Sequence, residues 1–289
     1  MQILVNTLYA AALIILVAIG AQIVYSATRF FHFAHGAILP LAAYLTYSFS
    51  RLLGFPLAVS ALLAIVLTGV VGAILELILF NPIRRRGASG LIMLLVSLGL
   101  YTVIINVLAA IFGDTILSFR TWPVQEGYSI WGARVTGLQI TTLCIGFVGI
   151  VVTRLILHGT SIGIRIRALA NDQSLARVVG IATRSTYSIT MAWASCIGGI
   201  AGVLTAADLG ATPHMGMRPL MYAVVAMIVG GNTLGGIVAG SLLLAGASQL
   251  SVVVLSARWQ DAIVFLILIV FLCARPQGFV GKPLKRIAV

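Results

Sequence analysis

Charged residues are scarce in this 289-residue chain, and acidic residues are the scarcest of them. Only 8% of the residues are charged, and 6 acidic residues stand against 18 basic ones. A soluble globular domain carries about 25% charged residues. Because 61% of the residues are hydrophobic, a soluble core of this size would lack an adequate polar shell. The shortage of charge therefore excludes an ordinary soluble protein.

Residues that usually hold metals or nucleotides are also few or badly spaced. Cys144, Cys196 and Cys273 each lie inside an apolar block and match no metal-ligand spacing, so we interpret them as small apolar side chains. His32 and His35 lie three residues apart, but no third ligand is visible nearby, so no metal site is expected. The sequence contains no P-loop string, which predicts that any nucleotide is handled by another chain.

Apolar residues instead form blocks close to the length, about 20 residues, that crosses a hydrocarbon core as a helix. Backbone groups in lipid must satisfy their own hydrogen bonds, so these blocks are expected to be helical. The short alternating segments of a membrane β-barrel are not seen. The sequence therefore predicts an all-α, polytopic membrane protein with a single transmembrane domain over residues 1–289.

About eight or nine membrane segments are expected from the hydrophobic pattern. The second, seventh and ninth blocks are short for a full span, which predicts broken, tilted or re-entrant elements there. The blocks run roughly over residues 3–27, 33–50, 57–80, 89–112, 138–157, 187–207, 219–232, 235–256 and 259–274.

Basic residues lie between the apolar blocks and give the chain its net charge of +12 at pH 7. In this position they indicate membrane topology and not nucleic-acid binding. The positive-inside rule places the turn at Arg84–Arg86, the stretch 154–184 and the basic tail after Arg275 in the cytoplasm. The loop at 113–137 has no net charge and carries aromatic residues, so it is expected outside. The N-terminus is then outside and the C-terminus cytoplasmic.

The longest polar stretch, about residues 158–186, is predicted to contain a short cytoplasmic helix. Asn171 and Asp172 can cap a helix that begins near Gln173, and Gly180 can end it. Ala176 shares a helix face with Asp172 and Gly180, and small side chains at this spacing let another surface approach closely. A helix of two turns is marginal alone, so it either docks on a partner or lies on the membrane surface near lipid headgroups.

Two polar or glycine-rich stretches interrupt the apolar blocks, at 29–40 and at 230–240. Transporters place such breaks beside the solute pathway, although small residues also serve close helix packing, and both interpretations stay open. The candidate pathway residues are His32, Phe33, His35, Gly36, Gly230, Gly231, Asn232 and Gly235.

Few charged residues fall at or within the apolar blocks. Glu76 is a functional candidate by position, but it precedes the Arg84 turn and can simply lie near the cytoplasmic face. Asp208 and Arg218 flank a short loop on the expected outer side. They could meet a partner protein or an amino-acid headgroup, although ordinary loop charges are the simpler interpretation. A local ion pair with Arg258 is the simple account of Asp261.

The polar stretch also carries a family resemblance. The pattern Gly163-x4-Ala168-x3-Asp172-x3-Ala176-x3-Gly180-Ile181 resembles the cytoplasmic loop of bacterial ATP-binding cassette (ABC) importer permeases, most closely the branched-chain amino acid permeases of the LivH type. Further segments that resemble this family follow in its order, at Phe33–Gly36, Asn81–Arg84, Gly198–Leu204, Val229–Gly236 and Arg275–Phe279.

This resemblance implies a translocation subunit of the bacterial inner membrane that moves branched-chain or related amino acids. It implies several partners: a second related permease subunit, two cytoplasmic ATPase subunits that bind ATP and Mg, a periplasmic solute-binding protein, and membrane lipid. No cofactor is expected in this chain. The residues expected to couple it to the ATPase are Gly163, Arg167, Ala168, Asp172, Ala176 and Gly180.

Departures from the family leave the solute open. His32 stands where the family usually has asparagine, and Ala37 where an acidic residue is frequent. The segment before the glycine-rich stretch usually continues from glycine into a small or basic helix start, and here it reads Met217-Arg218-Pro219-Leu220-Met221-Tyr222. Urea, short amides and aromatic acids therefore remain alternatives.

Two other functional classes are weaker. A secondary transporter or channel usually needs several intramembrane ionisable groups, and only Glu76 is a candidate. Gly87–Gly90 matches the short string of an intramembrane serine protease, but no histidine in a later span is placed to act as its base.

Overall fold

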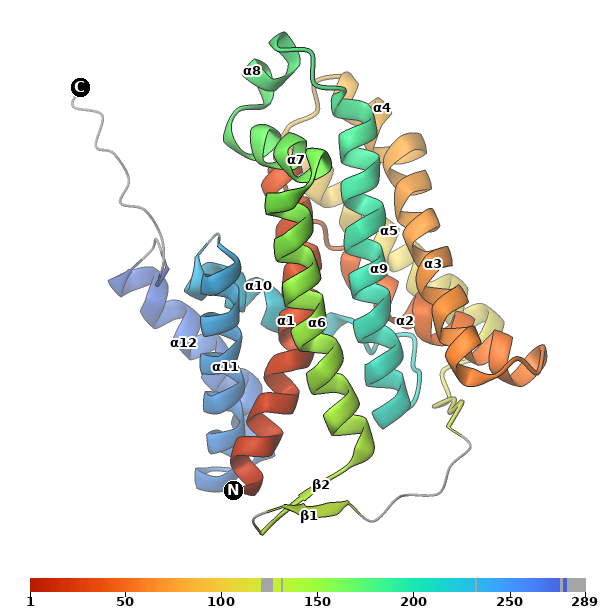
Figure 1. Ribbon diagram of the computed structural model, residues 1–289, viewed down its shortest axis with the longest axis vertical. Coiled ribbons are helices and arrows are strands. Elements are labelled where there is room, and N and C mark those ends of the chain that lie inside the picture. Colours follow the sequence, from red (N-terminus) through yellow and green to blue (C-terminus); the bar gives the residue numbers. More distant parts are fainter. Residues whose placement is uncertain (121–126, 131, 232, 276–277, 280–289) are drawn as a thin grey trace.

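A computed structural model describes residues 1–289 except 121–126, 131, 232, 276–277 and 280–289. Helices make up nearly all of its regular structure (Figure 1). In the first half these are α1 (Gln2–Thr28), α2 (His35–Tyr47) with a π-helical continuation (Ser48–Leu52), α3 (Leu57–Leu75) with a π-helical continuation (Glu76–Phe80), α4 (Asn81–Arg85) and α5 (Gly90–Phe112).

The second half begins after a small antiparallel hairpin of β1 (Tyr128–Ile130) and β2 (Ala133–Val135). Its helices are α6 (Gly137–Gly159), α7 (Ser161–Asn171), α8 (Gln173–Val178), α9 (Thr183–Leu209), α10 (Met217–Gly230), α11 (Leu234–Val254) and α12 (Gln260–Ala274), which a 3-10 turn (Ala257–Trp259) precedes.

Seven helical stretches in the described part of the chain are long and apolar enough to cross a membrane. They include α1, α5, α6, α9 and α11, the continuous stretch Leu57–Arg85, and α12 with the turn before it. The all-α, polytopic class predicted from the sequence is thus confirmed. The second and seventh blocks are short, as expected, and form α2 and the 14-residue α10. The ninth block is longer than expected because the 3-10 turn extends it to 18 residues.

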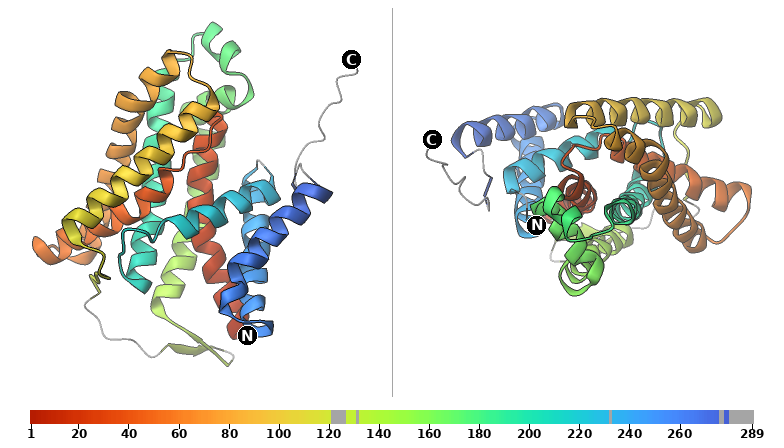
Figure 2. Two further views of the ribbon diagram at one scale, coloured as in Figure 1. Left: turned by 180° about the vertical axis from the view of Figure 1, so that it is seen from behind. Right: turned by 90° about the horizontal axis from the view of Figure 1, so that it is seen from above.

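Two helices, α1 and α9, form the centre of the bundle. Their spanning windows are the most buried of the seven, and both pack against several other helices. Helix α9 contacts α1, α2 and α3, whereas α1 also contacts α6, α10 and α11. In the view from above in Figure 2, α1 and α9 lie side by side in the middle of the bundle, between α11 and α3. By contrast, α12 buries very few of its residues, as expected of a helix at the periphery of the bundle that faces lipid or another subunit.

Glycines on α9 explain how closely the central helices approach. A Cβ atom on Gly202 would collide with the main chain of Leu39 in α2, and one on Gly199 would lie 2.6 Å from the Thr68 hydroxyl of α3. Association of helices in lipid depends on such close packing. The small-residue segment Gly198–Leu204 is therefore a packing surface for α2 and α3.

The two ends of the bundle differ in the elements they carry. The N-terminus and the β1–β2 hairpin lie at one end, and α4, α7 and α8 lie at the other (Figure 1). The basic turn at Arg84–Arg86 and the basic stretch 154–184 therefore share one end, opposite the N-terminus. This grouping matches the positive-inside pattern predicted for these loops.

Candidate functional site

The polar stretch after α6 folds as two short helices joined by sharp corners. Thr160 caps α7 by accepting a hydrogen bond from the Gly163 amide at 3.1 Å. A Cβ atom on Gly163 would collide with the carbonyl groups of Ile156 and Leu157. Only glycine fits this corner without a shift of the main chain, so Gly163 sets the direction in which α7 leaves α6.

Helix α8 begins and ends where its capping residues predict. The Asp172 carboxylate accepts hydrogen bonds from the amides of Ser174 (2.7 Å) and Leu175 (3.0 Å). At the other end, Gly180 adopts a φ of +83°, and the Ile181 amide returns to the carbonyl of Ala176 at 3.0 Å. The predicted helix from Gln173, closed by a left-handed Gly180, is confirmed.

The small-residue face of α8 points inward. Ala176 is 2% exposed and packs with Ala27, Leu169 and Tyr187. The surface that approaches Ala176 closely is thus the chain's own, so the interpretation of this face as the contact with a partner is not supported. The outer surface of α8 carries large apolar side chains instead: Leu175, Val178 and Val179 are 59%, 83% and 65% exposed.

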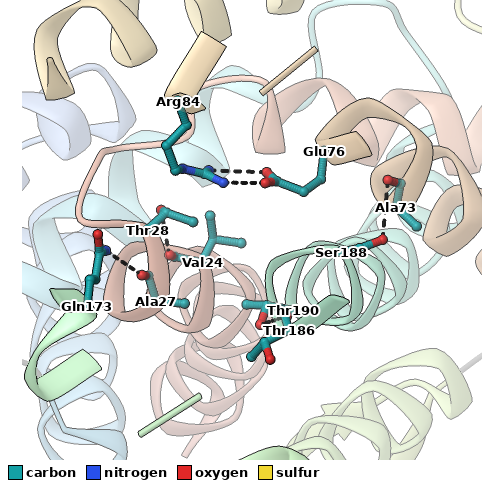
Figure 3. Close-up of polar contacts among 10 residues, drawn as sticks. All are labelled: Val24, Ala27, Thr28, Ala73, Glu76, Arg84, Gln173, Thr186, Ser188 and Thr190. Carbon is teal, nitrogen blue, oxygen red and sulfur yellow. Dashed lines mark hydrogen bonds and ion pairs between the residues drawn. The ribbon is translucent and has the colours of Figure 1, made fainter. Parts of the chain in front are cut away.

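Polar contacts fasten the two-helix loop to the end of α1 (Figure 3). The Gln173 amide donates a hydrogen bond to the carbonyl of Ala27 at 2.8 Å. Arg29, which ends α1 with a φ of +61°, donates from its guanidinium to the carbonyl of Ala170 in α7. Sequence reasoning missed both contacts, because each joins residues more than 140 positions apart. Of the other predicted coupling residues, Arg167 is exposed and Ala168 is half-buried.

Glu76 lies at the same end of the bundle and is paired. Its carboxylate is fully buried and accepts two hydrogen bonds from the Arg84 guanidinium, one of them at 3.3 Å (Figure 3). The same guanidinium lies over the Tyr187 ring of α9, 4.2 Å from its centroid. A buried carboxylate requires such compensation. Glu76 is therefore neutralised near the end that carries α4.

His35 occupies a slot between α1 and α9. The side chain is fully buried. A Cβ atom on Gly20 would lie 2.7 Å from the imidazole, and one on Gly198 would lie 2.9 Å from it. The ring thus fills the space left by two absent side chains. The geometry favours packing of His35 between the two helices over a direct contact with solute. A structural hydrogen bond of the imidazole, the other expected role, is not seen among the described residues. Gly36 is likewise in close contact, with Leu220 and Gly216 of the α10 region.

The stretch before His35 is held by protein groups. His32 is buried and meets the Phe80 ring edge-on at 5.1 Å. The Phe33 amide donates to the Ser97 hydroxyl of α5 at 3.1 Å, and that hydroxyl donates to the carbonyl of Phe31. The adjoining space measures about 10 Å³, too little for a solute and near the size of one water. In this conformation the first break is packed.

The second break is a close helix hairpin. Gly230 and Gly236 lie against each other's main chain, and a Cβ atom on Gly240 would lie 3.1 Å from the Gly230 amide nitrogen. Gly231 is buried with a φ of +84°. Gly235 differs, because it has open space around it and lines a cavity. Asn232 lies outside the described residues.

Two larger cavities lie along opposite halves of α1. The first, of about 730 Å³, is bounded by α1, α6, α7 and the start of α11, and its wall includes Arg29, Arg167 and Gly235. The second, of about 480 Å³, is bounded by α1, α9, α10 and α11 near the N-terminal end, and its wall includes Tyr9 and Arg218. Residues of both predicted breaks thus line the first cavity: Arg29 from the first break, and Thr233 and Gly235 from the second.

Arg218 makes an ion pair that the sequence did not reveal. Its Nε lies 2.8 Å from a carboxylate oxygen of Asp261. The expected local pair between Asp261 and Arg258 is therefore wrong. Helix α12 packs against α10, which brings the first turn of α12 to Arg218.

The family is decided by a match over residues 3–272 to the family model described as "Branched-chain amino acid transport system / permease component". The chain belongs to this family. It is a membrane permease subunit of branched-chain amino acid ABC transport, and not an enzyme.

Relatives and a solved structure agree with this placement. The high-affinity branched-chain amino acid transport system permease protein LivH of Escherichia coli K12 is 26% identical, over 93% of this chain and 91% of that protein. The corresponding BraD protein of Pseudomonas aeruginosa is 26% identical, over 98% and 96%. The structure of PsaBC from Streptococcus pneumoniae in complex with Fab has a similar fold, with a TM-score of 0.52 at 15% identity over 96% of this chain and 94% of that one.

Proposed function

We propose that this chain is the translocation subunit of an ABC importer that moves branched-chain amino acids across the bacterial inner membrane. A periplasmic solute-binding protein delivers the solute, a second related permease subunit completes the membrane pathway, and two cytoplasmic ATPase subunits bind ATP and Mg. The observation that carries the proposal is the α7–α8 loop, which presents an apolar surface at one end of the bundle while being fixed to its core.

The exposed side of α8 suits a protein groove. Leu175 and Val178 of this six-residue helix, and Val179 directly after it, are more than half exposed. Clustered exposed apolar side chains with polar surroundings are typical of a docking site. Arg177 of the same helix is also exposed, so the patch has a charged neighbour. We therefore assign the outer face of α8, and not Ala176, to direct contact with the ATPase.

The inner side of α8 connects the proposed ATPase contact to the bundle. Ala176 packs on Tyr187 of α9 and on Ala27 of α1, and Gln173 is hydrogen-bonded to Ala27. These contacts join the short helix to the two central helices of the bundle. Movement of α8 with an ATPase groove would therefore displace the ends of α1 and α9 and change the cavities between the helices.

Orientation follows from the two unequal ends. The end with α4, α7 and α8 carries the arginine-rich loops and would face the cytoplasm and the ATPases. The N-terminus and the β1–β2 hairpin would face the periplasm and the solute-binding protein. This assignment agrees with the expected topology of an outside N-terminus.

Neither rival class gains support from the geometry. Glu76, the candidate for ion coupling, is already paired with Arg84. The Ser89 hydroxyl accepts the Ile92 amide at 3.4 Å as the cap of α5, which explains the serine of the protease-like string without catalysis.

The proposal is tested by co-expressing the chain with candidate partner subunits and reconstituting the complex in liposomes. We expect leucine uptake that requires both ATP and the solute-binding protein. Uptake by the purified chain alone, driven by an ion gradient and indifferent to ATP, would contradict the proposal. Replacement of ATP by a non-hydrolysable analogue is the matched control.

A further inference from the structure

The 480 Å³ cavity at the N-terminal end has the size of a small-molecule site. Ligand pockets usually measure about 300–1,000 Å³ and combine apolar walls with a few polar groups. Its α1 wall is aliphatic, formed by Leu13, Ile14 and Val17. Thr205 and Ser248 contribute hydroxyls from α9 and α11. We call this space the Arg218 cavity.

Arg218 is the single charged residue in the lining of the Arg218 cavity, taken over the described residues. Its Nε contacts Asp261 at 2.8 Å, and its Nη2 donates to the Gln260 side chain at 3.0 Å. Its Nη1 makes no hydrogen bond within the described part of the chain. A guanidinium binds a carboxylate through two parallel N–H donors, so this group is suited to a ligand carboxylate.

Two tyrosine–aspartate pairs flank the same space. Tyr9 donates its hydroxyl to Asp208 at 2.8 Å, and Tyr222 donates its hydroxyl to Asp261 at 2.7 Å. Both tyrosines line the cavity, and both aspartates are exposed. Asp261 is committed to Arg218, whereas Asp208 forms no ion pair with any described residue. A positive group and an aliphatic wall therefore line one cavity. Asp208 lies beside this lining, where it accepts the hydrogen bond of the lining residue Tyr9.

We propose that the Arg218 cavity receives the zwitterion of an aliphatic amino acid. Arg218 holds the carboxylate, Asp208 holds the ammonium group, and Leu13, Ile14 and Val17 contact the side chain. The inference rests on the proposed function and adds the place where the solute first meets this subunit. Under the orientation argued above, the cavity lies in the half of the bundle nearest the solute-binding protein.

The ion pair of Arg218 with Asp261 can be exchanged for one with a ligand carboxylate. The side chains of Arg218 and Asp261 are 56% and 54% exposed. Ion pairs open to solvent are weak, so a ligand carboxylate can replace Asp261 at the guanidinium. Tyr222 keeps its hydrogen bond to Asp261 during the exchange, and the displaced carboxylate stays solvated.

The site is tested by photolabelling the full chain in nanodiscs with L-photo-leucine, a diazirine analogue of leucine, followed by peptide mapping. We expect label on the Leu13–Val17 wall. Excess L-leucine should compete at least tenfold better than leucinamide, which lacks the carboxylate, or 4-methylpentanoate, which lacks the ammonium group. Arg218→Gln should lower the label at least tenfold, with partial recovery in Arg218→Lys. Arg258→Gln, an exposed arginine at the same end, is the control and should label as the wild type.

Several results would overturn the site. One is equal labelling of the wall in the wild type and in Arg218→Gln; another is equal competition by leucine and leucinamide. The competition arm uses the unmodified chain, so it does not depend on the folding of any variant. Labelling elsewhere in a complex that performs ATP-driven leucine uptake would remove the site and leave the proposed function. Wall labelling with the expected competition, in a complex without ATP-driven uptake, would support the site and overturn the function.

Discussion

Gln173 of α8 donates a hydrogen bond of 2.8 Å to the carbonyl of Ala27 in the last turn of α1. The contact joins the helix that is exposed at one end of the bundle to a helix whose other half lines the Arg218 cavity. A single rigid helix thus connects the proposed ATPase contact with the proposed solute site. Coupling between distant sites needs an element of this kind, which both sites can displace.

Gln173→Leu should uncouple transport while leaving the chain inserted. The substitution removes the donor to Ala27 and keeps a side chain of similar length. A hydrogen bond of this type contributes about 1 kcal/mol, so we expect uptake per ATP hydrolysed to fall by a factor of about 5. The measurement compares uptake with ATPase rate in liposomes. Ser174→Ala is the matched control, because the exposed Ser174 contributes its main-chain amide to the Asp172 cap. An unchanged ratio in Gln173→Leu would contradict this role.

Val178→Asp should prevent assembly with the ATPase. Val178 is 83% exposed, so a charge there costs the free chain little, but an aspartate would be desolvated in an apolar groove. We expect co-purified ATPase to drop at least tenfold, with normal yield of the membrane subunit. Val178→Thr keeps the branched shape and should retain most of the partner. Equal recovery of ATPase with Val178→Asp and with the wild type would show that the docking surface lies elsewhere.

Local features of this loop were predictable from the sequence, and its direction was not. Asp172 and Gly180 define the limits of α8 because capping and positive φ are properties of single residues. The inward direction of Ala176 depends on Tyr187 and Ala27, which no local pattern specifies. For the same reason the sequence suggested Arg258 as the partner of Asp261, although Arg218 lies 43 positions away. Long-range packing decided each of these cases.

The positions of the two breaks were likewise predictable from the sequence, and their packing was not. Their positions follow from polar and glycine-rich interruptions of apolar blocks, and they lie at the boundary between α1 and α2 and between α10 and α11. Whether an interruption is packed or lines open space depends on the facing helix. Gly20 and Gly198 accept the His35 ring, and neither glycine is near His35 in sequence.

Gly180→Ala should loosen the loop more than Gly180→Asn. The φ of +83° at this position disfavours alanine by about 1 kcal/mol, whereas asparagine visits the left-handed region more readily. Open space surrounds the site, so added volume is not the cause. We expect faster proteolysis between residues 172 and 183 in the alanine variant, measured on the chain in nanodiscs. Equal cleavage rates for both variants would show that the backbone conformation is not the constraint.

Breaking the Glu76–Arg84 pair should destabilise the fold and leave the dependence of uptake on ions unchanged. Glu76→Leu leaves a guanidinium unpaired beside Tyr187, and loss of one partner of a buried pair costs about 3–5 kcal/mol. The double variant Glu76→Leu/Arg84→Met should recover much of the loss, because it removes both charges. Thermal unfolding in detergent measures the difference. Loss of a proton requirement in the single variant would instead support ion coupling through Glu76.

His35 and its two glycines should behave as one packing unit. His35→Ala empties a buried slot, and large-to-small changes in a core cost about 2–5 kcal/mol. Gly198→Ala alone should also destabilise the fold, because its Cβ would lie 2.9 Å from the imidazole. In the double variant His35→Ala/Gly198→Ala the new methyl group occupies part of the empty slot, so the combined loss should be smaller than the sum. Thermal unfolding of the four forms measures this coupling. Strict additivity, or loss of leucine uptake in His35→Ala with unchanged stability, would indicate that His35 acts on the solute and not on the packing of α1 against α9.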